Sequence, residues 1–321
     1  MKRRVFVGGA LSGTALAAAQ NPAVKASAKP TGGGIPKRKF GKTGVELTII
    51  GQAGGRFPLC AFDEAVAITR RAFDLGINYF DNAHAYWDGR SEEVYGAALQ
   101  GIRKDIFLTS KALDRTRIGA RKQLEESLKR MKTDHLDLWQ IHAVGEMEEV
   151  EKIFAPGGAI EAFEAAKKEG LCRFIGFTGH RDPAVHAEMM KRYKNFDTIL
   201  MPLHIADAGY LSFERGALRE ANKQELGVQA MKTTANAKLL QAFSVRECIR
   251  YALTLKVHTA ALGCTTIGQL EDDVRIAREF EPLNDTAMAA LRQRADRIKG
   301  PDLEDWKRNT ESASLRPYAG G

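Results

Sequence analysis

The sequence predicts a single (β/α)8 barrel, a TIM barrel, and three observations carry that prediction. From residue 47 onward, eight short apolar runs alternate with segments whose apolar residues recur at helical spacing. These units occupy about 230 residues, which suits one closed barrel better than an open sheet. No Gly-x-Gly-x-x-Gly sequence follows the first run, so an open dinucleotide-binding sheet is disfavoured. Polar side chains also stand at the ends of three consecutive runs, the edge at which such barrels build their sites.

The composition fits a soluble globular protein with a sizeable core. The 321 residues are 44% hydrophobic and 27% charged. The net charge is +8, but residues 1–28 hold four basic residues and no acidic one, so half of the excess positive charge lies in this segment. No basic run is interleaved with aromatic residues elsewhere, which argues against a nucleic-acid partner. The four cysteines form no Cys-x-x-Cys pair, so we expect no metal site, while a disulfide stays open.

The first 28 residues resemble a twin-arginine (Tat) signal peptide. Arg3 and Arg4 precede a Gly- and Ala-rich apolar stretch, and Ala26-Ser27-Ala28 supplies small residues for cleavage. The stretch is too weakly hydrophobic for a permanent membrane span. We therefore expect export through the Tat machinery, to the periplasm or beyond, with a flexible linker over 29–35 and the barrel with its C-terminal extension over 36–321. A flexible basic tail or an uncleaved anchor is the alternative interpretation.

The elements follow one another with recognisable boundaries. Gly41 and Gly44 predict a hairpin or tight turn before the first barrel strand. Ser91 is a candidate N-cap, and Pro183 suits the first turn of a helix. The expected strands are 47–50, 77–80, 106–111, 136–141, 172–177, 198–201, 227–231 and 257–262. The expected helices are 63–75, 92–100, 121–131, 159–168, 183–194, 213–225, 245–255 and 270–279, followed by a helical tail with a helix over 286–299. Trp306 in this tail is expected to be buried against the barrel, and capping of the barrel mouth is the alternative.

Four reactive side chains stand at the carboxyl ends of the second, third and fourth strands. Asp81 ends the apolar run at 77–80, and Tyr86 follows five residues later in the loop. Lys111 ends the next strand, and His142 ends the one after it. Each residue alone has an ordinary structural explanation, such as a solvated lysine or a satisfied core histidine. Because adjacent parallel strands open at one edge, we expect all four side chains to meet in the mouth of the barrel.

These four groups suit proton transfer to a carbonyl oxygen. A phenol has a pKa of about 10 and is a weak acid at neutral pH, and a neighbouring ammonium lowers that pKa. Asp81 would keep Lys111 charged and in place, and His142 would orient the carbonyl beside Tyr86. Such a relay serves carbonyl reduction, or alcohol oxidation in reverse, with the hydride exchanged with a cofactor.

The chain resembles the aldo-keto reductases over nearly everything from Pro36 to Phe280. The matching segments are FGKTGVEL (40–47), GINYFDNAHAYWDGRSEEVYGAAL (76–99), IFLTSK (106–111), LDLWQIH (136–142), IGFTGH (175–180) and GCTTIGQLEDDV (263–274). The resemblance implies a (β/α)8 fold and a nicotinamide cofactor. It also implies a catalytic tetrad with Tyr86 as the general acid/base, made of Asp81, Tyr86, Lys111 and His142.

The resemblance also indicates contacts to cofactor and substrate. Gly54 lies among small residues that let a ligand approach the backbone, and Thr178 stands where the family contacts the carboxamide. Met231 takes the place of an aromatic residue that stacks on the nicotinamide, and Lys232 beside it is a phosphate contact or a solvated strand-end lysine. The residues expected around the adenosine and its phosphate are Gly263, Cys264, Thr265, Gln269, Asp272 and Asp273. The expected substrate contacts are His180, which contacts the substrate or the carboxamide, and Trp87, as a platform for a sugar-like or aromatic substrate or else packed in its loop.

NADP(H) is the cofactor that the resemblance implies, and NAD(H) is the alternative. The loop over 263–274 has no basic residue for a 2′-phosphate before Arg275. We expect an exported oxidoreductase that moves hydride between the nicotinamide and a small-molecule carbonyl or hydroxyl group. Because compartments outside the cytoplasm hold no free nicotinamide pool, a tightly bound cofactor and a redox-neutral reaction would suit such an enzyme. The other hypothesis is a non-catalytic nicotinamide-binding barrel that acts as a binding or regulatory module.

Overall fold

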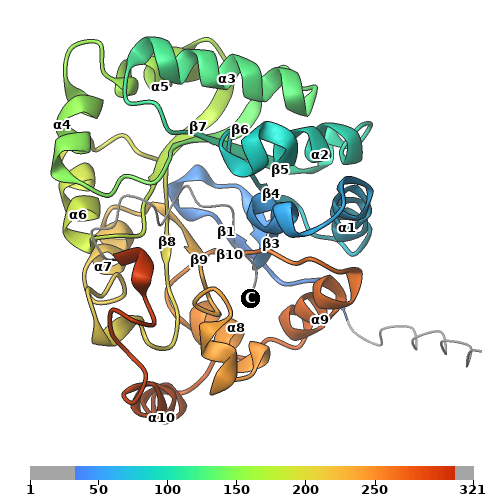
Figure 1. Cartoon of the computed structure of the whole chain (residues 1–321), viewed down its shortest axis with the longest axis vertical. Helices are drawn as coiled ribbons and strands as arrows, with labels where there is room; N and C mark the ends of the chain where they lie inside the picture. The colour runs from blue at the N-terminus through green and yellow to red at the C-terminus, as the bar shows by residue number, and fades with distance from the viewer. Residues whose placement is uncertain (1–32, 308–321) are drawn as a thin grey trace, which may run out of the picture. The chain divides into compact units, whose positions relative to one another are not determined.

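The structure, a computed structural model, describes residues 33–307 of the chain. Eight parallel strands close into a barrel in the order β10-β3-β4-β5-β6-β7-β8-β9, which confirms the predicted (β/α)8 fold (Figure 1). The strands are β3 (Ile50–Ala53), β4 (Tyr79–Asp81), β5 (Phe107–Ala112), β6 (Leu136–Ile141), β7 (Cys172–Thr178), β8 (Thr198–Pro202), β9 (Gly227–Met231) and β10 (Thr259–Leu262). The predicted signal peptide, the linker up to residue 32 and residues 308–321 lie outside the described range.

Helices surround the barrel on its outer face (Figure 1). They are α1 (Phe62–Asp74), α2 (Arg90–Ala98), α3 (Arg117–Met131), α4 (Met147–Phe154), α5 (Ala159–Lys168), α6 (Pro183–Arg192), α7 (Ala217–Lys223), α8 (Val245–Thr254), α9 (Ile267–Arg278) and α10 (Asp285–Ala295). In α3, for example, Thr116 caps the first turn, and buried Ala120, Leu124 and Met131 recur at helical spacing on the face toward the barrel. Within residues 33–307, no helix is long and apolar enough to cross a membrane.

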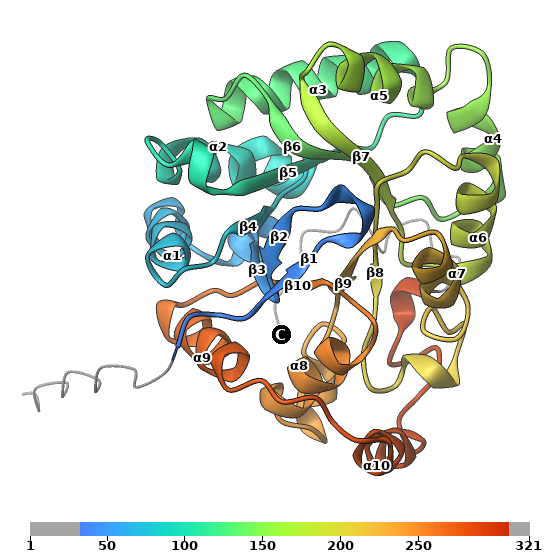
Figure 2. The same cartoon turned by 180° about the vertical axis from the view of Figure 1, so that it is seen from behind.

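A two-stranded antiparallel hairpin closes the barrel at the amino ends of its strands (Figure 2). It consists of β1 (Lys37–Lys39) and β2 (Glu46–Thr48). Phe40 and Leu47 are fully buried and pack among the side chains of the barrel interior. Gly227 leaves room for this contact, since a Cβ there would lie 2.7 Å from the Phe40 ring. The hairpin therefore seals one end of the barrel and leaves the carboxyl ends of the strands as the open end.

Two boundaries near the N-terminus correct the sequence prediction. The predicted first strand over 47–50 is divided, because Leu47 belongs to β2 and the barrel strand begins at Ile50. Ser91 is not the N-cap of α2, because that helix already begins at Arg90. The Ser91 hydroxyl instead donates a 2.9 Å hydrogen bond to the Gly54 carbonyl, which ties α2 to the turn after β3.

Several helices also differ from the prediction. α3 begins at Arg117 and α9 at Ile267, before the predicted 121 and 270, and α10 ends at Ala295 rather than at 299. The sequence prediction lacks α4, whose eight residues are too few for a helical period to stand out. α7 begins at Ala217 rather than at 213. The Asp207 carboxylate accepts a hydrogen bond from the backbone N–H of Glu214 at 2.8 Å, and this contact holds the preceding residues in a loop.

A separate group of buried apolar side chains lies beneath the C-terminal segment. It joins the loops after β8 and β9 to α8, α10 and the last described residues. Trp306 belongs to this group and is 1% exposed, so it is buried, as predicted, but among the loops after β8 and β9 and the helices α8 and α10. Figure 1 shows the last described segment, in red, beside β8 and α7.

Candidate active site

The carboxyl ends of β4, β5 and β6 bring together the four side chains that the sequence singled out. Asp81 is the last residue of β4, Lys111 is the penultimate residue of β5, and His142 directly follows β6. Tyr86 opens the 3-10 turn that follows β4 (Tyr86–Gly89). These three strands are neighbours in the barrel, and all four side chains line one cavity.

Asp81 and Lys111 form a buried ion pair. Lys111 Nζ lies 2.7 Å from Asp81 Oδ2 and donates to the Asn82 carbonyl at 2.6 Å. The other carboxylate oxygen, Oδ1, accepts from the Thr109 hydroxyl at 3.0 Å and lies 3.1 Å from the Tyr79 hydroxyl. Because both carboxylate oxygens are held, the position of the Lys111 ammonium is fixed as well.

Tyr86 and His142 face each other next to this ion pair. Their ring centroids are 5.5 Å apart with the planes at 80°, and Lys111 Nζ lies 5.0 Å from the Tyr86 centroid. The two residues after Tyr86, Trp87 and Asp88, have φ angles of 53° and 51°. Residues other than glycine rarely adopt this left-handed backbone conformation, which costs about 1–2 kcal/mol per residue. Such strain is typical of a segment that positions a functional side chain.

Burial dominates the acid–base properties of the four side chains. It raises the pKa of Tyr86 far above the ordinary phenol value, and the charge of Asp81 raises it further. The net shift is therefore upward rather than the lowering that Lys111 alone predicts, because desolvation of the phenolate is the largest cause. Burial also lowers the pKa of Lys111, against the opposing effect of Asp81, and lowers the pKa of His142 well below its usual range. At neutral pH the site thus holds a protonated phenol and a neutral imidazole.

A cavity of about 380 Å³ extends from these side chains toward the loops after β7, β9 and β10. Thr178 is positioned by a 2.9 Å hydrogen bond from the Ala143 backbone N–H to its hydroxyl. His180 Nδ1 is buried with no hydrogen-bond partner among the described residues, and burial lowers the pKa of this imidazole well below its usual range. Beyond the tetrad, the lining contains these residues that the sequence predicted: Thr178, His180, Met231, Lys232, Gly263, Cys264, Thr265, Gln269 and Asp273.

Three predicted contacts lie outside the lining of this cavity. Gly54 faces the protein interior, where a Cβ would lie 2.3 Å from a side-chain oxygen of α2. Trp87 is half-buried and stacks on the Arg90 guanidinium, 4.8 Å from its ring centroid, so loop packing explains it. Asp272 lies on the exposed face of α9 and pairs with Arg275 at 2.7 Å. The structure therefore does not bring Gly54, Trp87 or Asp272 to the candidate site.

Comparison with known proteins connects this site to a family. A profile of the Aldo/keto reductase family matches residues 53–243, which is more than half of the chain. The chain belongs to the aldo/keto reductase family. The matched range contains the whole tetrad and the cavity residues as far as the loop after β9.

Individual relatives agree with this assignment, and solved structures share the fold. The oxidoreductase YqkF of Bacillus subtilis (strain 168) is 33% identical over 183 residues. The match covers 53% of this chain and 57% of that relative, which is less than two thirds of its length. The L-galactose dehydrogenase of Arabidopsis thaliana is 27% identical over 290 residues, covering 78% of this chain and 90% of that protein. The holo form of the aldo-keto reductase AKR11C1 from Bacillus halodurans superposes with a TM-score of 0.69 at 24% identity, covering 87% of this chain and 99% of that one. An aldo-keto reductase from Klebsiella pneumoniae in complex with NADPH superposes with a TM-score of 0.66 at 23% identity. The match covers 80% of this chain and 94% of that one.

This aldo/keto reductase also places two basic side chains on the cavity wall. Arg56, in the turn after β3, packs against the loop after β10, since a Cβ on Gly263 would lie 2.5 Å from Arg56 Cγ. Lys232 follows β9, and burial lowers its pKa to about 8, with Asp305 opposing the shift and Arg56 adding to it. Sequence reasoning missed Arg56 because it lies about two hundred positions from the loop that it touches. Its place among glycines directly after the first barrel strand was the available signal.

The residues present fit a nicotinamide dinucleotide, the cofactor implied by the family. In the cavity, His142 and His180 keep a buried Nδ1 without a hydrogen-bond partner among residues 33–307. Arg56 and Lys232 line the same cavity and provide the positive charge that phosphate groups require. The cavity therefore offers both hydrogen-bonding groups and cationic groups to such a cofactor.

Proposed function

We propose that this chain is an NAD(P)-dependent oxidoreductase that moves hydride between a nicotinamide and a small-molecule carbonyl or hydroxyl group. The observation that supports this most strongly is the meeting of Asp81, Tyr86, Lys111 and His142 in one cavity that Arg56 and Lys232 also line. Membership of the aldo/keto reductase family supports the same reaction class. The dehydrogenase name of the Arabidopsis relative agrees with it as well.

Tyr86 is the proposed general acid/base. In the reductive direction its phenol, kept protonated by its raised pKa, donates a proton to the substrate oxygen as negative charge develops there. Lys111, whose ammonium lies 5.0 Å from the ring, stabilises the phenolate that remains. Neutral His142 orients the substrate oxygen beside Tyr86. The nicotinamide, when bound, supplies or accepts the hydride.

NADP(H) is the proposed cofactor. The loop after β10 has no basic residue for a 2′-phosphate, and Arg56, which packs against this loop from the turn after β3, supplies that cation. The NADPH complex of the Klebsiella protein supports the same choice. NAD(H) is the second candidate, because the half-buried Asp273 lines the same wall. Burial and the neighbouring Asp272 raise the pKa of Asp273 to about 7, and its ionised form would repel a 2′-phosphate.

Arg56→Met is expected to separate the two cofactors. If Arg56 pairs with the 2′-phosphate, the substitution weakens NADPH binding about tenfold or more and NADH binding less than threefold, measured as Kd by fluorescence titration. Arg275→Met is the matched control, since Arg275 is an exposed arginine paired with Asp272 in α9. Equal losses for NADPH and NADH would assign Arg56 to the pyrophosphate, and a loss in the control alone would assign the 2′-phosphate to Arg275.

We further propose export through the Tat machinery to the periplasm, with the cofactor carried in tightly bound form. The paired arginines and the small-residue site of the N-terminal segment support export. A captive cofactor favours a redox-neutral reaction, in which successive substrate oxidation and reduction return the nicotinamide to its starting state. The placement of Trp87 away from the cavity removes the aromatic platform that favoured a sugar-like substrate.

The test is the cofactor content of protein purified from the periplasm without added nucleotide. We expect about one NADP(H) or NAD(H) per chain after denaturation and mass spectrometry. The control is a variant lacking residues 1–28, which should stay in the cytoplasm. Empty periplasmic protein that still oxidises NADPH with a carbonyl substrate would contradict the captive cofactor alone. Protein that neither binds nor oxidises NADPH or NADH would contradict the oxidoreductase.

A further inference from the structure

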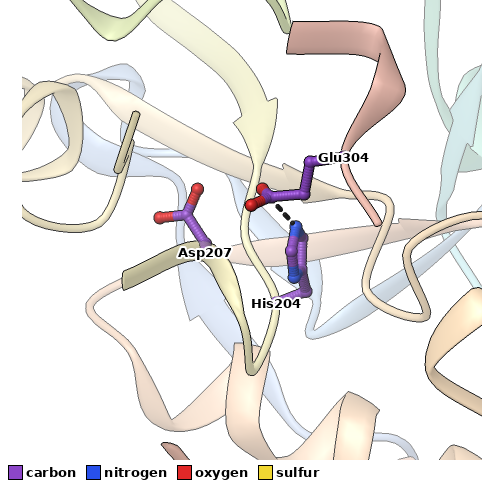
Figure 3. A group of neighbouring side chains, drawn as sticks. All are labelled: His204, Asp207 and Glu304. Atoms are coloured by element: carbon purple, nitrogen blue, oxygen red, sulfur yellow. Dashed lines mark ion pairs between the residues drawn. The ribbon is translucent and has the colours of Figure 1, made fainter. Parts of the chain in front are cut away.

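Four ionisable side chains lie fully buried between the loop after β8 and the last described residues, and Figure 3 draws three of them. They are His204, Asp207, Glu304 and Lys307, each with a side chain 0% exposed. Lys307 Nζ lies 2.8 Å from Asp207 Oδ1 and 2.5 Å from Glu304 Oε1. His204 Nε2 lies 3.0 Å from Glu304 Oε1, and Figure 3 shows the three side chains that it draws gathered at one point. The proposed mechanism uses none of these groups.

Lys307 supplies the cation that two buried carboxylates require. The ligand atoms of His204, Asp207 and Glu304 lie within 4.8 Å of one another, a spacing that would also suit a metal ion. The Lys307 ammonium, however, donates to Asp207 Oδ1 and to the Tyr210 carbonyl at 2.7 Å and also pairs with Glu304, so it supplies positive charge to both carboxylates. The Glu304 oxygens and the His204 nitrogens make no hydrogen bond among the described residues. Ion pairs with Lys307 therefore join the two segments, and elemental analysis tests whether a metal ion is present as well.

This network fastens the end of the chain to the barrel. Asp207 belongs to the loop after β8 and is itself held by the Ser212 hydroxyl at 3.1 Å and the Glu214 backbone N–H at 2.8 Å. Glu304 and Lys307 belong to the segment 302–307, which we call the C-terminal clamp. Removing one charge from such a buried network leaves its partner uncompensated, so the clamp is held closed cooperatively.

The C-terminal clamp rests against the loop over 232–240, which we call the Lys232 loop. Trp306 in the clamp lies with its ring centroid 4.9 Å from Lys232 Nζ. Asp305 in the clamp pairs with Lys238 of the loop at 3.1 Å. Apolar contacts join the two segments within one buried cluster, to which Ala235, Leu239, Leu303 and Trp306 all belong.

The Lys232 loop is strained and lines the cavity. Lys232, Ala235, Asn236 and Ala237 have φ angles of 55°, 50°, 55° and 71°, a conformation that residues other than glycine rarely adopt. Such a loop keeps this conformation only where its surroundings hold it. Several of its residues line the cavity, namely Lys232, Thr233, Thr234, Asn236, Ala237 and Leu240. The loop is thus placed between the cofactor site and the clamp.

We propose that the C-terminal clamp is a positioning element that holds the strained Lys232 loop so that Lys232 faces a phosphate of the cofactor. The inference rests on the proposed function, because it assigns a cofactor phosphate to Lys232. Opening the clamp lets the loop relax and moves the Lys232 ammonium, whereas the tetrad on β4, β5 and β6 stays in place. The clamp therefore sets how tightly the cofactor is held rather than the rate of the chemical step.

Lys307→Met tests this arrangement by removing the ammonium while keeping the length of the side chain. We expect the Kd for NADPH to rise at least tenfold, with kcat at saturating NADPH within threefold of wild type. The matched control is Lys191→Met, because Lys191 forms only an exposed ion pair with Glu188 on α6. It should change neither quantity.

A double-variant cycle links the clamp to Lys232. If the clamp acts through Lys232, adding Lys307→Met to Lys232→Met should weaken NADPH binding less than twofold further. Additive losses of NADPH affinity in the double variant would overturn the proposal. A Lys307→Met variant with a lowered melting temperature but an unchanged Kd for NADPH would also overturn it, because that result indicates a purely structural role. One divalent ion per chain in elemental analysis of the wild type would also overturn it, by assigning the cluster to a metal.

Hydrogen exchange on the wild type provides a test that does not depend on folding of the variants. The clamp and the Lys232 loop should open as one unit, with protection factors that agree within about threefold and rise together on NADPH binding. Protection that differs more than tenfold between the two segments would overturn the proposal. A wild type that binds no NADPH contradicts the proposed function instead, and common opening of the two segments would still be visible in it.

Discussion

Tyr86→Phe is expected to lower kcat for carbonyl reduction about 10³-fold while leaving the Kd for NADPH within about threefold of the wild type. The substitution removes one oxygen and keeps the ring against His142, where the centroids lie 5.5 Å apart. It therefore deletes the proton donor without opening the cavity. Steady-state kinetics and fluorescence titration of the same preparation separate the two quantities.

The matched control for this substitution is Tyr193→Phe. The Tyr193 hydroxyl contacts Glu164 at 3.0 Å on the outer face of the barrel, so its loss should not change turnover. An unchanged kcat in Tyr86→Phe would contradict the proposed role and favour the non-catalytic binding module. The pH profile gives a second control. Because burial raises the pKa of Tyr86, the phenol stays protonated as the pH rises from 6 to 9, and reduction should not lose its acid in that range.

The barrel and the tetrad could be predicted because both depend on the local order of the chain. Each strand is a short apolar run, and the residue at its carboxyl end must lie in the mouth of a closed parallel barrel. Asp81, Lys111 and His142 are therefore placed by counting strands, and no knowledge of distant contacts is needed. The same reasoning fails at the first strand, where hairpin and barrel strand are separated by one residue, Ile49.

The features that sequence reasoning missed depend on contacts between distant parts of the chain. Arg56 contacts Gly263, and Lys307 contacts Asp207, over sequence separations that no hydrophobic periodicity predicts. The direction of the pKa shift of Tyr86 also depends on burial, which strand counting does not give. Trp87 shows the reverse case, since its place beside Tyr86 suggested the cavity, but two left-handed residues turn the chain there and it stacks on Arg90.

Lys111→Met is expected to lower kcat about 10²- to 10³-fold and also to reduce the free energy of unfolding by about 3–5 kcal/mol. The loss of activity follows because nothing remains to stabilise the phenolate form of Tyr86. The loss of stability follows because Asp81 is left with an uncompensated charge in a site where its side chain is 3% exposed. Chemical denaturation and steady-state kinetics measure the two effects.

The double variant Asp81→Asn with Lys111→Met separates these two effects. Removing both charges together should restore most of the lost stability, because the amide can still accept from the Thr109 hydroxyl. It should restore none of the activity, because the ammonium is still missing. Lys167→Met is the matched control: that lysine pairs with Asp197 at 2.6 Å but is 38% exposed, so its loss should change stability by about 0–1 kcal/mol and kcat not at all. Recovery of turnover in the double variant would mean that Lys111 serves only to neutralise Asp81, and the proton relay would then have to be assigned without it.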